Sequence, residues 1–267
     1  MIILTLFGFQ SACCQSYDLP ERGLCAHRGA MTAFPENTIP ALQEAVRLGA
    51  HMIEFDVQFS KDSALVIMHD ASVDRTTDGI GKVADLTLEE IKRLDAGSWK
   101  EERFSGEKVP VLDEVLDIMP RNVWLNIHIK GGKETGKKVA ENILRTNRQH
   151  QAVLAVEREA AAGARSVSDK ILICNMERQS GKWDYVDGTI AMKADFIQLR
   201  GEIFPKFKEY VQKLHSHGIK VNYFGTDEPE KIRLLWDYGV DFPLVNDINR
   251  SIKLVENAGV LPVKPQF

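Results

Sequence analysis

The sequence predicts an α/β fold, and more narrowly a (β/α)8 TIM barrel with a small insertion subdomain after the second strand. Eight short apolar segments alternate with amphipathic helical patterns. Such alternation implies a parallel sheet, and eight repeats favour its closure into a barrel. The 267 residues are enough for one barrel of this kind. The alternative is a doubly wound open sheet, but its Gly-x-Gly-x-x-Gly signature does not follow the first strand.

The repeating unit can be followed along the chain. The predicted strands cover 23–26, 52–57, 123–129, 152–156, 171–174, 195–199, 219–224 and 242–245. The predicted helices cover 37–48, 112–118, 134–148, 157–167, 204–217 and 228–238, with weaker patterns at 178–193 and 249–257. Helix-end signals support these boundaries, because Pro229 stands just inside one predicted start and Gly239 just past the same helix. Gly49 and Gly218 end two further helices.

One stretch, 59–110, is longer than the connections of a βα repeat usually are. It contains a predicted strand at 64–68, a turn at Asp78-Gly79 and a short helix at 88–94. In a barrel it would form a subdomain over the carboxyl ends of the strands, where long loops are usually functional. We therefore expect a single catalytic barrel domain over 20–262 that contains this insertion.

Residues 1–14 are unlike the rest of the chain. The run from Met1 to Phe9 is apolar and uncharged, and small residues precede Cys13, as at the end of a secretory signal. The segment also resembles a bacterial lipoprotein leader, although Gln10 and the missing basic residues depart from that pattern. We expect an exported protein, a periplasmic or outer-envelope lipoprotein of a bacterium, tethered to a membrane through a lipidated Cys13. The alternative is an apolar extension that packs on the barrel.

The composition excludes some classes of partner. Lys and Arg number 34 and Asp and Glu 38, so the net charge is -4, and the basic residues do not collect in one stretch. Binding to nucleic acid or to an anionic membrane surface is therefore not expected, and a small molecule is the expected partner. Cys25 and Cys174 lie in apolar runs, which predicts buried free thiols.

Polar residues follow three of the predicted strands. His27 follows the first strand, Glu54 and Asp56 end the second, and His128 with Lys130 ends the third. In a barrel these positions meet at the carboxyl face, where active sites form. Glu54 and Asp56 are two apart on a strand, so they point to the same side and repel each other unless a cation or proton lies between them. The pair predicts a divalent-metal site that polarises a phosphoryl oxygen.

Two histidines and two cations complete the predicted chemistry. His27 and His69, which lies just after the strand of the insertion, are candidates for general base and general acid. Arg28 and Lys130 are candidates for holding phosphate oxygens. Each histidine could instead be structural and bond only to nearby backbone. Glu36 is expected to cap the helix that begins near it.

These residues lie in segments that resemble the glycerophosphodiester phosphodiesterase family, and more broadly the TIM barrel phosphodiesterases similar to phosphatidylinositol phospholipase C. The blocks follow one another in order through nearly the whole chain after the leader. They are His27-Arg28-Gly29, Pro35-Glu36-Asn37-Thr38, Gly49-Ala50, Ile53 to Val57, Lys61-Asp62, His69-Asp70, Arg75 to Gly79, Asn126 to Lys130 and Gly239-Val240-Asp241.

The resemblance implies a metal-dependent hydrolase that converts glycerophosphodiesters to sn-glycerol 3-phosphate and an alcohol. It implies that His27 and His69 form the acid–base pair, with His27 as the base. It also implies that Glu54 and Asp56 bind Mg²⁺ or Ca²⁺.

Three positions depart from the family pattern. His128 stands where the family has a third glutamate ligand, Phe224 stands where a tryptophan lines the substrate pocket, and Asn246 replaces a threonine. A neutral imidazole removes a negative charge and is a poor Ca²⁺ ligand, so Mn²⁺ or Zn²⁺ is an alternative to Mg²⁺ or Ca²⁺. His128 could instead contact substrate or be an inert replacement. Because Phe224 changes the wall of the expected pocket, the sequence does not determine the substrate headgroup.

The sequence is therefore compatible with three functions. The first is a metal-dependent glycerophosphodiester phosphodiesterase with His/His acid–base catalysis. The second keeps the phosphodiester chemistry with another headgroup, as in a phospholipase D-like enzyme. The third is a non-catalytic phosphodiester-binding barrel, against which the retention of both histidines and both carboxylates argues.

Overall fold

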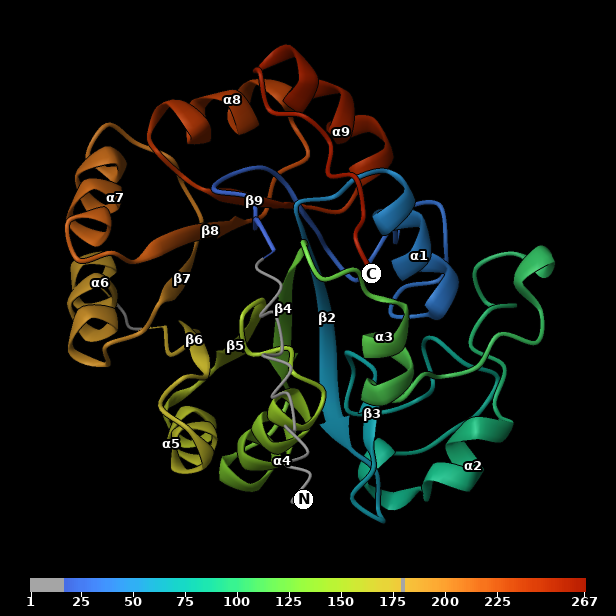
Figure 1. Cartoon of the computed structure of the whole chain (residues 1–267). Coiled ribbons are helices and arrows are strands. Elements are labelled where there is room, and N and C mark those ends of the chain that lie inside the picture. Colours follow the sequence, from blue (N-terminus) through green and yellow to red (C-terminus); the bar gives the residue numbers. More distant parts are fainter. Residues whose placement is uncertain (1–16, 179–180) are drawn as a thin grey trace, which may run out of the picture.

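A closed ring of parallel strands forms the centre of the computed structural model, which describes residues 17–178 and 181–267 (Figure 1). The barrel strands are β1 (Cys25–Ala26), β2 (Met52–Phe59), β4 (Trp124–Ile129), β5 (Ala152–Val156), β6 (Leu172–Asn175), β7 (Phe196–Arg200), β8 (Lys220–Phe224) and β9 (Phe242–Val245). Each pairs in parallel with its neighbour, and β1 pairs with both β2 and β9. The sheet is therefore closed, which confirms the predicted barrel and excludes the open sheet.

Helices between the strands surround the barrel in Figure 1. They are α1 (Ile39–Arg47), α3 (Leu112–Ile118), α4 (Lys133–Arg145), α5 (Arg158–Val167), α6 (Lys182–Ala191), α7 (Phe207–His215), α8 (Pro229–Asp237) and α9 (Ile248–Asn257). Every predicted helix forms, with ends that differ from the predicted ones by a few residues. The weak pattern at 178–193 forms the shorter α6.

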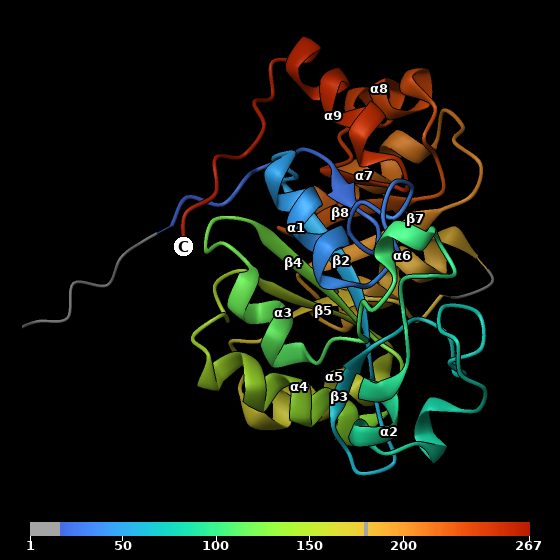
Figure 2. The same cartoon turned by 90° about the vertical axis from the view of Figure 1, so that its right-hand side faces the viewer.

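The insertion leaves the barrel after β2 and carries its own small core (Figure 2). β3 (Leu65–Ile67) pairs antiparallel with the end of β2, so it lies outside the parallel ring. α2 (Leu88–Arg93) begins with a capping box between Thr87 and Glu90. The apolar side chains of the insertion pack on each other, including Val66, Met68, Val73, Val83 and Ile91. The insertion thus holds its loops against the carboxyl end of β2.

The first described residues and the C-terminal segment pack against the opposite end of the barrel. The Trp124 indole donates a hydrogen bond to the carbonyl of Pro20, and Val263 N donates to Gly49 O. The carbonyl of Lys264 accepts from the Asn122 side chain, so contacts with the barrel continue past residue 262. The predicted leader over 1–14, with Cys13, lies outside the described residues. No helix of the described chain is long and apolar enough to cross a bilayer.

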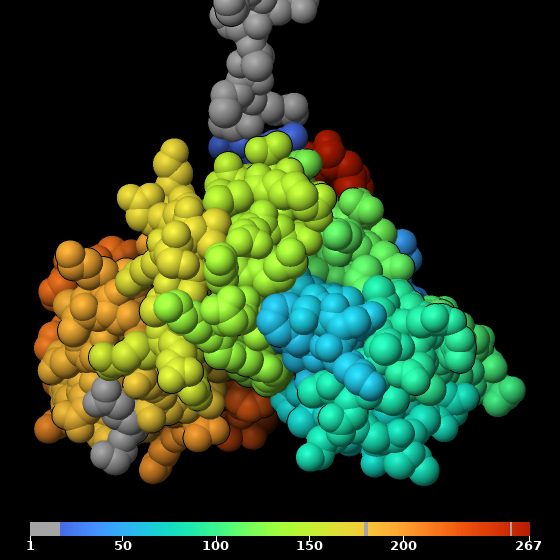
Figure 3. Space-filling view, turned by 90° about the horizontal axis from the view of Figure 1, so that it is seen from below, coloured from blue at the N-terminus to red at the C-terminus, as the bar shows by residue number. Residues whose placement is uncertain are grey.

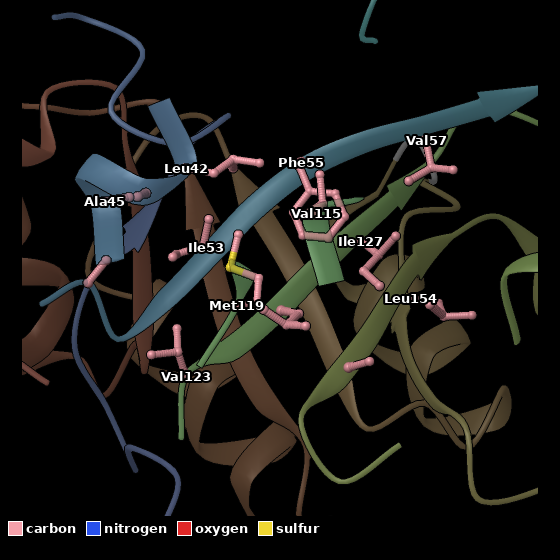
Figure 4. Packing of buried hydrophobic residues seen from close by; sticks show 14 of the residues in the cluster. Leu42, Ala45, Ile53, Phe55, Val57, Val115, Met119, Val123, Ile127 and Leu154 are labelled. Carbon is pink, nitrogen blue, oxygen red and sulfur yellow. The ribbon is translucent and has the colours of Figure 1, made fainter. Parts of the chain in front are cut away.

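The alternation of side chains along β2 separates the core from the site. Ile53, Phe55 and Val57 face α1 and α3, where they pack on Leu42, Val115 and Met119 (Figure 4). Fully burying such a side chain contributes about 1.5–3 kcal/mol. Because successive side chains on a strand alternate, Glu54 and Asp56 point into the barrel. The apolar contacts outside therefore fix the carboxylates inside. Cys25 and Cys174 are buried free thiols, as predicted.

Two glycines allow α4 and α5 to cross closely, and these helices follow the strands that border the site. A Cβ added at Gly136 would lie 2.1 Å from Ala160 O, and one at Gly163 would lie 1.9 Å from Lys133 O. Both obstacles are backbone atoms, which cannot rotate away. The two glycines therefore set the spacing of the loops at the ends of β4 and β5.

Substituting Gly136 with alanine should destabilise the barrel. Overpacking costs up to about 3 kcal/mol when the obstacle is backbone, while alanine gains about 1 kcal/mol of helix propensity, so we expect a net loss of about 2 kcal/mol. The measurement is the free energy of unfolding in denaturant, with Lys137→Ala on the exposed side of α4 as control, expected within about 0.5 kcal/mol of wild type. An unchanged stability in Gly136→Ala would contradict this account of the crossing.

Candidate active site

A cluster of three metal-ligating groups lies inside the barrel at the carboxyl ends of β2 and β4. The pairing of β2 with β4 sets Asp56 beside His128 in register. His128 Nδ1 lies 3.2 Å from Asp56 Oδ1 and 3.7 Å from Glu54 Oε1. One ligand atom from each of the three residues lies within 4.8 Å of the others. The predicted carboxylate pair and His128 thus meet at one point.

Positive groups surround the buried Asp56 carboxylate. Burial opposes its ionisation, but hydrogen bonding to His128 and the charges of Lys130 and Arg28 hold the pKa of Asp56 well below its usual range. Burial alone would lower the pKa of the His128 imidazole, but the Asp56 and Glu54 carboxylates outweigh it and raise that pKa. Lys130 Nζ lies 3.1 Å from Asp56 Oδ1. The site is therefore built around an ionised Asp56.

Asn37 fixes the Asp56 carboxylate from the side opposite His128. Its Nδ2 donates to Asp56 Oδ2 at 2.9 Å, and its Oδ1 accepts from Asp56 N at 3.2 Å. Asn37 has a positive φ of 59°, a conformation that asparagine tolerates better than most residues. The Oδ1 atom of Asp56 is buried and has no hydrogen-bond partner of good geometry in the described structure.

The three residues fit a divalent cation. Carboxylate oxygens and an imidazole nitrogen are ligands for Mg²⁺, Mn²⁺ or Zn²⁺, and one such atom from each of the three residues lies within 4.8 Å of the others. Glu54 Oε2 accepts from Arg28 N at 3.0 Å, so the backbone of the first βα loop orients the Glu54 carboxylate. These contacts hold the ligands in place, as metal sites require.

The His27 imidazole is held by the last two βα loops. Its Nδ1 lies 2.7 Å from Asn246 Oδ1, and the Asn246 amide donates to Asp227 Oδ2. Its Nε2 lies 3.9 Å from Glu54 Oε2. The Phe224 ring meets the His27 ring edge to face, with centroids 5.1 Å apart. Phe224 therefore lies beside His27 in the lining of the cavity.

The His69 imidazole is held from the insertion. Its Nδ1 lies 2.6 Å from Asp70 Oδ1, and Arg75 Nε donates to Asp70 Oδ2 at 2.6 Å. Hydrogen bonding from Arg75 holds the pKa of the Asp70 carboxyl well below its usual range. An ionised carboxylate therefore faces the ring that the sequence assigns to acid–base chemistry.

Arg28 is held by carboxylates on two sides. Its Nη1 donates to Glu36 Oε1 at 2.7 Å, and its Nε lies 3.4 Å from Asp56 Oδ2. Glu36 does not cap α1, because Thr38 is the N-cap residue and makes no side-chain cap. The expected capping role was wrong, since the carboxylate turns to Arg28 and Arg75 instead. Gly29, at φ 77°, lets this loop approach the Ala41 backbone, where a Cβ would lie 2.6 Å away.

A cavity of about 190 Å³ joins these groups at the mouth of the barrel. Figure 3 shows the surface hollowed between the cyan insertion and the yellow-to-orange half of the barrel. The cavity is lined by all the candidate residues except the deeper Asp56, together with four polar or sulfur-bearing residues that sequence reasoning missed. Those four are Met176, Arg178, Gln198 and Arg200.

Arg178 and Arg200 add positive charge to the far side of the cavity. Burial and the charge of Arg200 lower the pKa of Arg178. Within residues 17–178 and 181–267, neither guanidinium hydrogen-bonds to a protein group. Arg200 ends β7 and Arg178 follows β6. Their positions at the carboxyl ends of predicted strands are the sequence feature that could have identified them as site residues. Two converging guanidinium groups can bind an anion.

Residues 27–250 match the model of the glycerophosphoryl diester phosphodiesterase family. The chain belongs to this family. A glycerophosphodiester phosphodiesterase of Caldanaerobacter subterraneus subsp. tengcongensis is 32% identical over 243 residues, which cover 88% of this chain and 98% of the relative. Another from Bacillus subtilis is 28% identical over 257 residues, covering 88% of this chain and 87% of the relative. The protein is therefore a phosphoric diester hydrolase.

Solved structures of similar proteins have the same fold. A glycerophosphodiester phosphodiesterase of Agrobacterium tumefaciens has a TM-score of 0.76 at 25% identity, covering 87% of this chain and 99% of its own. A phosphodiesterase of Oleispira antarctica, solved with the product sn-glycerol-3-phosphate, has a TM-score of 0.77 at 24% identity, covering 89% and 97%.

Replacing Asn37 by alanine should weaken metal binding. The substitution removes both hydrogen bonds that orient Asp56, and losing such a supporting contact typically costs about 10–100-fold in metal affinity. The measurement is a calorimetric titration with Mn²⁺. Asn142→Ala, which removes a hydrogen bond to Asp113 on the outer helices, is the matched control. Equal Mn²⁺ affinity in Asn37→Ala and wild type would show that Asn37 does not support the ligand.

Proposed function

We propose that this protein is a metal-dependent phosphodiesterase that hydrolyses glycerophosphodiesters to sn-glycerol 3-phosphate and an alcohol. One observation carries the proposal. Two histidines with different hydrogen-bond partners face one cavity beside a cluster of Glu54, Asp56 and His128. Such a cavity places acid–base groups, cationic groups and metal ligands within reach of one phosphodiester.

The partners of His27 favour a role as general base. The Asn246 Nδ2 donates to Asp227, so its Oδ1 faces His27 and must accept from the ring. His27 therefore carries its proton on Nδ1 and presents a lone pair on Nε2. That lone pair can take the proton of a water molecule, or of a glycerol hydroxyl, as its oxygen attacks phosphorus. In the second case the alcohol leaves, and water must then open the cyclic phosphate to give sn-glycerol 3-phosphate.

The partner of His69 favours a role as general acid. Asp70 is an ionised carboxylate, and a carboxylate holds an imidazolium through a charge-assisted hydrogen bond. The proton on the cavity side of His69 can then pass to the leaving oxygen as its bond to phosphorus breaks. Each such proton transfer typically contributes about 10²–10⁴-fold to the rate.

The remaining side chains hold the phosphate. Lys130, Arg178 and Arg200 line the cavity and carry charge complementary to the non-bridging oxygens, and Arg28 lines the same cavity. When bound by Glu54, Asp56 and His128, a divalent cation would polarise a phosphoryl oxygen and offset the charge that develops on phosphorus.

The three candidate ligands indicate which metal ion the site would prefer. Mg²⁺ or Ca²⁺ would suit the three carboxylates typical of the family, but His128 supplies a nitrogen in place of one carboxylate. Imidazole is a good ligand for Zn²⁺, whereas Ca²⁺ prefers oxygen. We therefore propose that Mn²⁺ or Zn²⁺ supports the reaction better than Ca²⁺ does.

Replacing His69 by alanine tests the function directly. We expect the variant to lose about 10²-fold or more of kcat on glycerophosphoethanolamine or glycerophosphoglycerol, because the leaving alkoxide is no longer protonated. The measurement is release of sn-glycerol 3-phosphate with Mg²⁺, Ca²⁺, Mn²⁺ or Zn²⁺ in turn. His217→Ala, whose ring bonds only to neighbours at the end of α7, is the control.

Two outcomes would contradict the proposal in different ways. If wild type and His69→Ala cleave glycerophosphodiesters equally fast with every metal, His69 is not the general acid and the proposed mechanism fails. If wild type cleaves other diesters but no glycerophosphodiester, the phosphodiester chemistry stands and the glycerol headgroup is wrong.

A further inference from the structure

A continuous series of ion pairs joins Arg28, in the first βα loop, to His69, in the insertion. Arg28 Nη1 donates to Glu36 Oε1 at 2.7 Å. Arg75 donates to both oxygens of Glu36, through Nη1 at 2.9 Å and through Nη2 at 2.8 Å. The same guanidinium donates to both oxygens of Asp70, which in turn bonds to His69 Nδ1. Glu36 and Arg75, in the middle of this series, have no part in the proton transfers proposed for His27 and His69.

Glu36 anchors the series in the barrel. Only 5% of its side chain is exposed, so its charge must be paired to be tolerated. Burial opposes ionisation, but hydrogen bonds from Arg75 and the charges of Arg28 and Arg75 lower the pKa of Glu36. A carboxylate that is buried, ionised and bonded on both oxygens is a rigid attachment point. Arg28, its other partner, is itself fixed by Glu54 and Asp56.

Arg75 occupies the one position that links this anchor to the insertion. Its planar guanidinium directs five N–H groups, so it can bond two carboxylates at once, which a lysine ammonium cannot do with the same geometry. Its side chain is 44% exposed, so its contribution to global stability should be small. Its geometry instead matters for where Asp70, and with it His69, is placed.

We propose that Arg75 is a positioning residue for the reaction, and that Glu36 is its anchor. Arg75 clamps Asp70, and Asp70 holds the His69 ring at the angle from which it protonates the leaving alkoxide. This inference rests on the proposed function, in particular on His69 as the general acid. The insertion would then position His69 beside the phosphate, because the Arg75 guanidinium bonds to both Glu36 and Asp70.

Substrates with different leaving groups can distinguish a positioning role of Arg75 from a general structural role. An alkoxide needs a proton as it departs, whereas p-nitrophenolate is a stable anion that departs without one. A defect confined to the placement of His69 should therefore slow the cleavage of alkyl esters and spare the p-nitrophenyl ester of glycerol phosphate. A defect in folding, in metal binding or in phosphate binding should slow both.

The experiment compares Arg75→Gln, Arg75→Lys and Glu36→Gln with wild type on glycerophosphoethanolamine and on p-nitrophenyl glycerophosphate. We expect Arg75→Gln to lose about 10²-fold of kcat on the first substrate, with KM little changed, and to cleave the second nearly as fast as wild type. Arg75→Lys should remain impaired, because an ammonium cannot form the shared fork. Arg93→Gln is the matched control, since this exposed arginine of the same insertion pairs only with Glu89.

Thermal unfolding of each variant accompanies the assays. Equal losses on both substrates in a variant that unfolds like wild type, or no loss on either, would overturn the role of Arg75. If Arg75→Gln unfolds early, Arg75→Lys gives the same substrate comparison, because it keeps the positive charge beside Glu36 and Asp70 but not the shared fork. A wild type that cleaves neither ester would instead refute the proposed function, and the positioning role would fall with it.

Discussion

The site depends on keeping the Asp56 carboxylate ionised inside the barrel. A buried charge is costly unless it is paired and hydrogen-bonded, and Asp56 is fully buried. Asn37 and Arg28 turn toward it from the first βα loop, and His128 and Lys130 from the end of β4. Removing any one of these groups would leave the buried charge less well compensated. The geometry of the cavity therefore follows from compensating a single negative charge.

Much of the fold, and the residues around Glu54 and Asp56, could be predicted because their positions depend on the strands. The period-two alternation of β2 puts Ile53, Phe55 and Val57 on the apolar side, so Glu54 and Asp56 had to face inward. In a parallel barrel, all carboxyl ends of strands share one face, so His27, His128 and Lys130 had to approach the pair. The register of β2 with β4 then sets Asp56 beside His128.

The rest depends on contacts between loops, which no periodic pattern encodes. Asn246 and Asp227 reach His27 from the far end of the chain, and Arg75 reaches Glu36 across 39 residues of sequence. Glu36 was misassigned because a carboxylate near a helix start is usually a cap, and here two arginines compete successfully for it. Arg178 and Arg200 stood at strand ends, yet basic residues at such positions are common on barrel rims. The roles of residues at such positions can be recognised only in the folded structure.

We propose that His128 replaces a carboxylate as a metal ligand beside Glu54 and Asp56. Pulsed electron paramagnetic resonance of the Mn²⁺-loaded protein detects nitrogen bound to the ion. We expect a coupling from one imidazole nitrogen in wild type, which disappears in His128→Glu while Mn²⁺ remains bound. A wild-type spectrum without nitrogen coupling, or one that His128→Glu leaves unchanged, would contradict it.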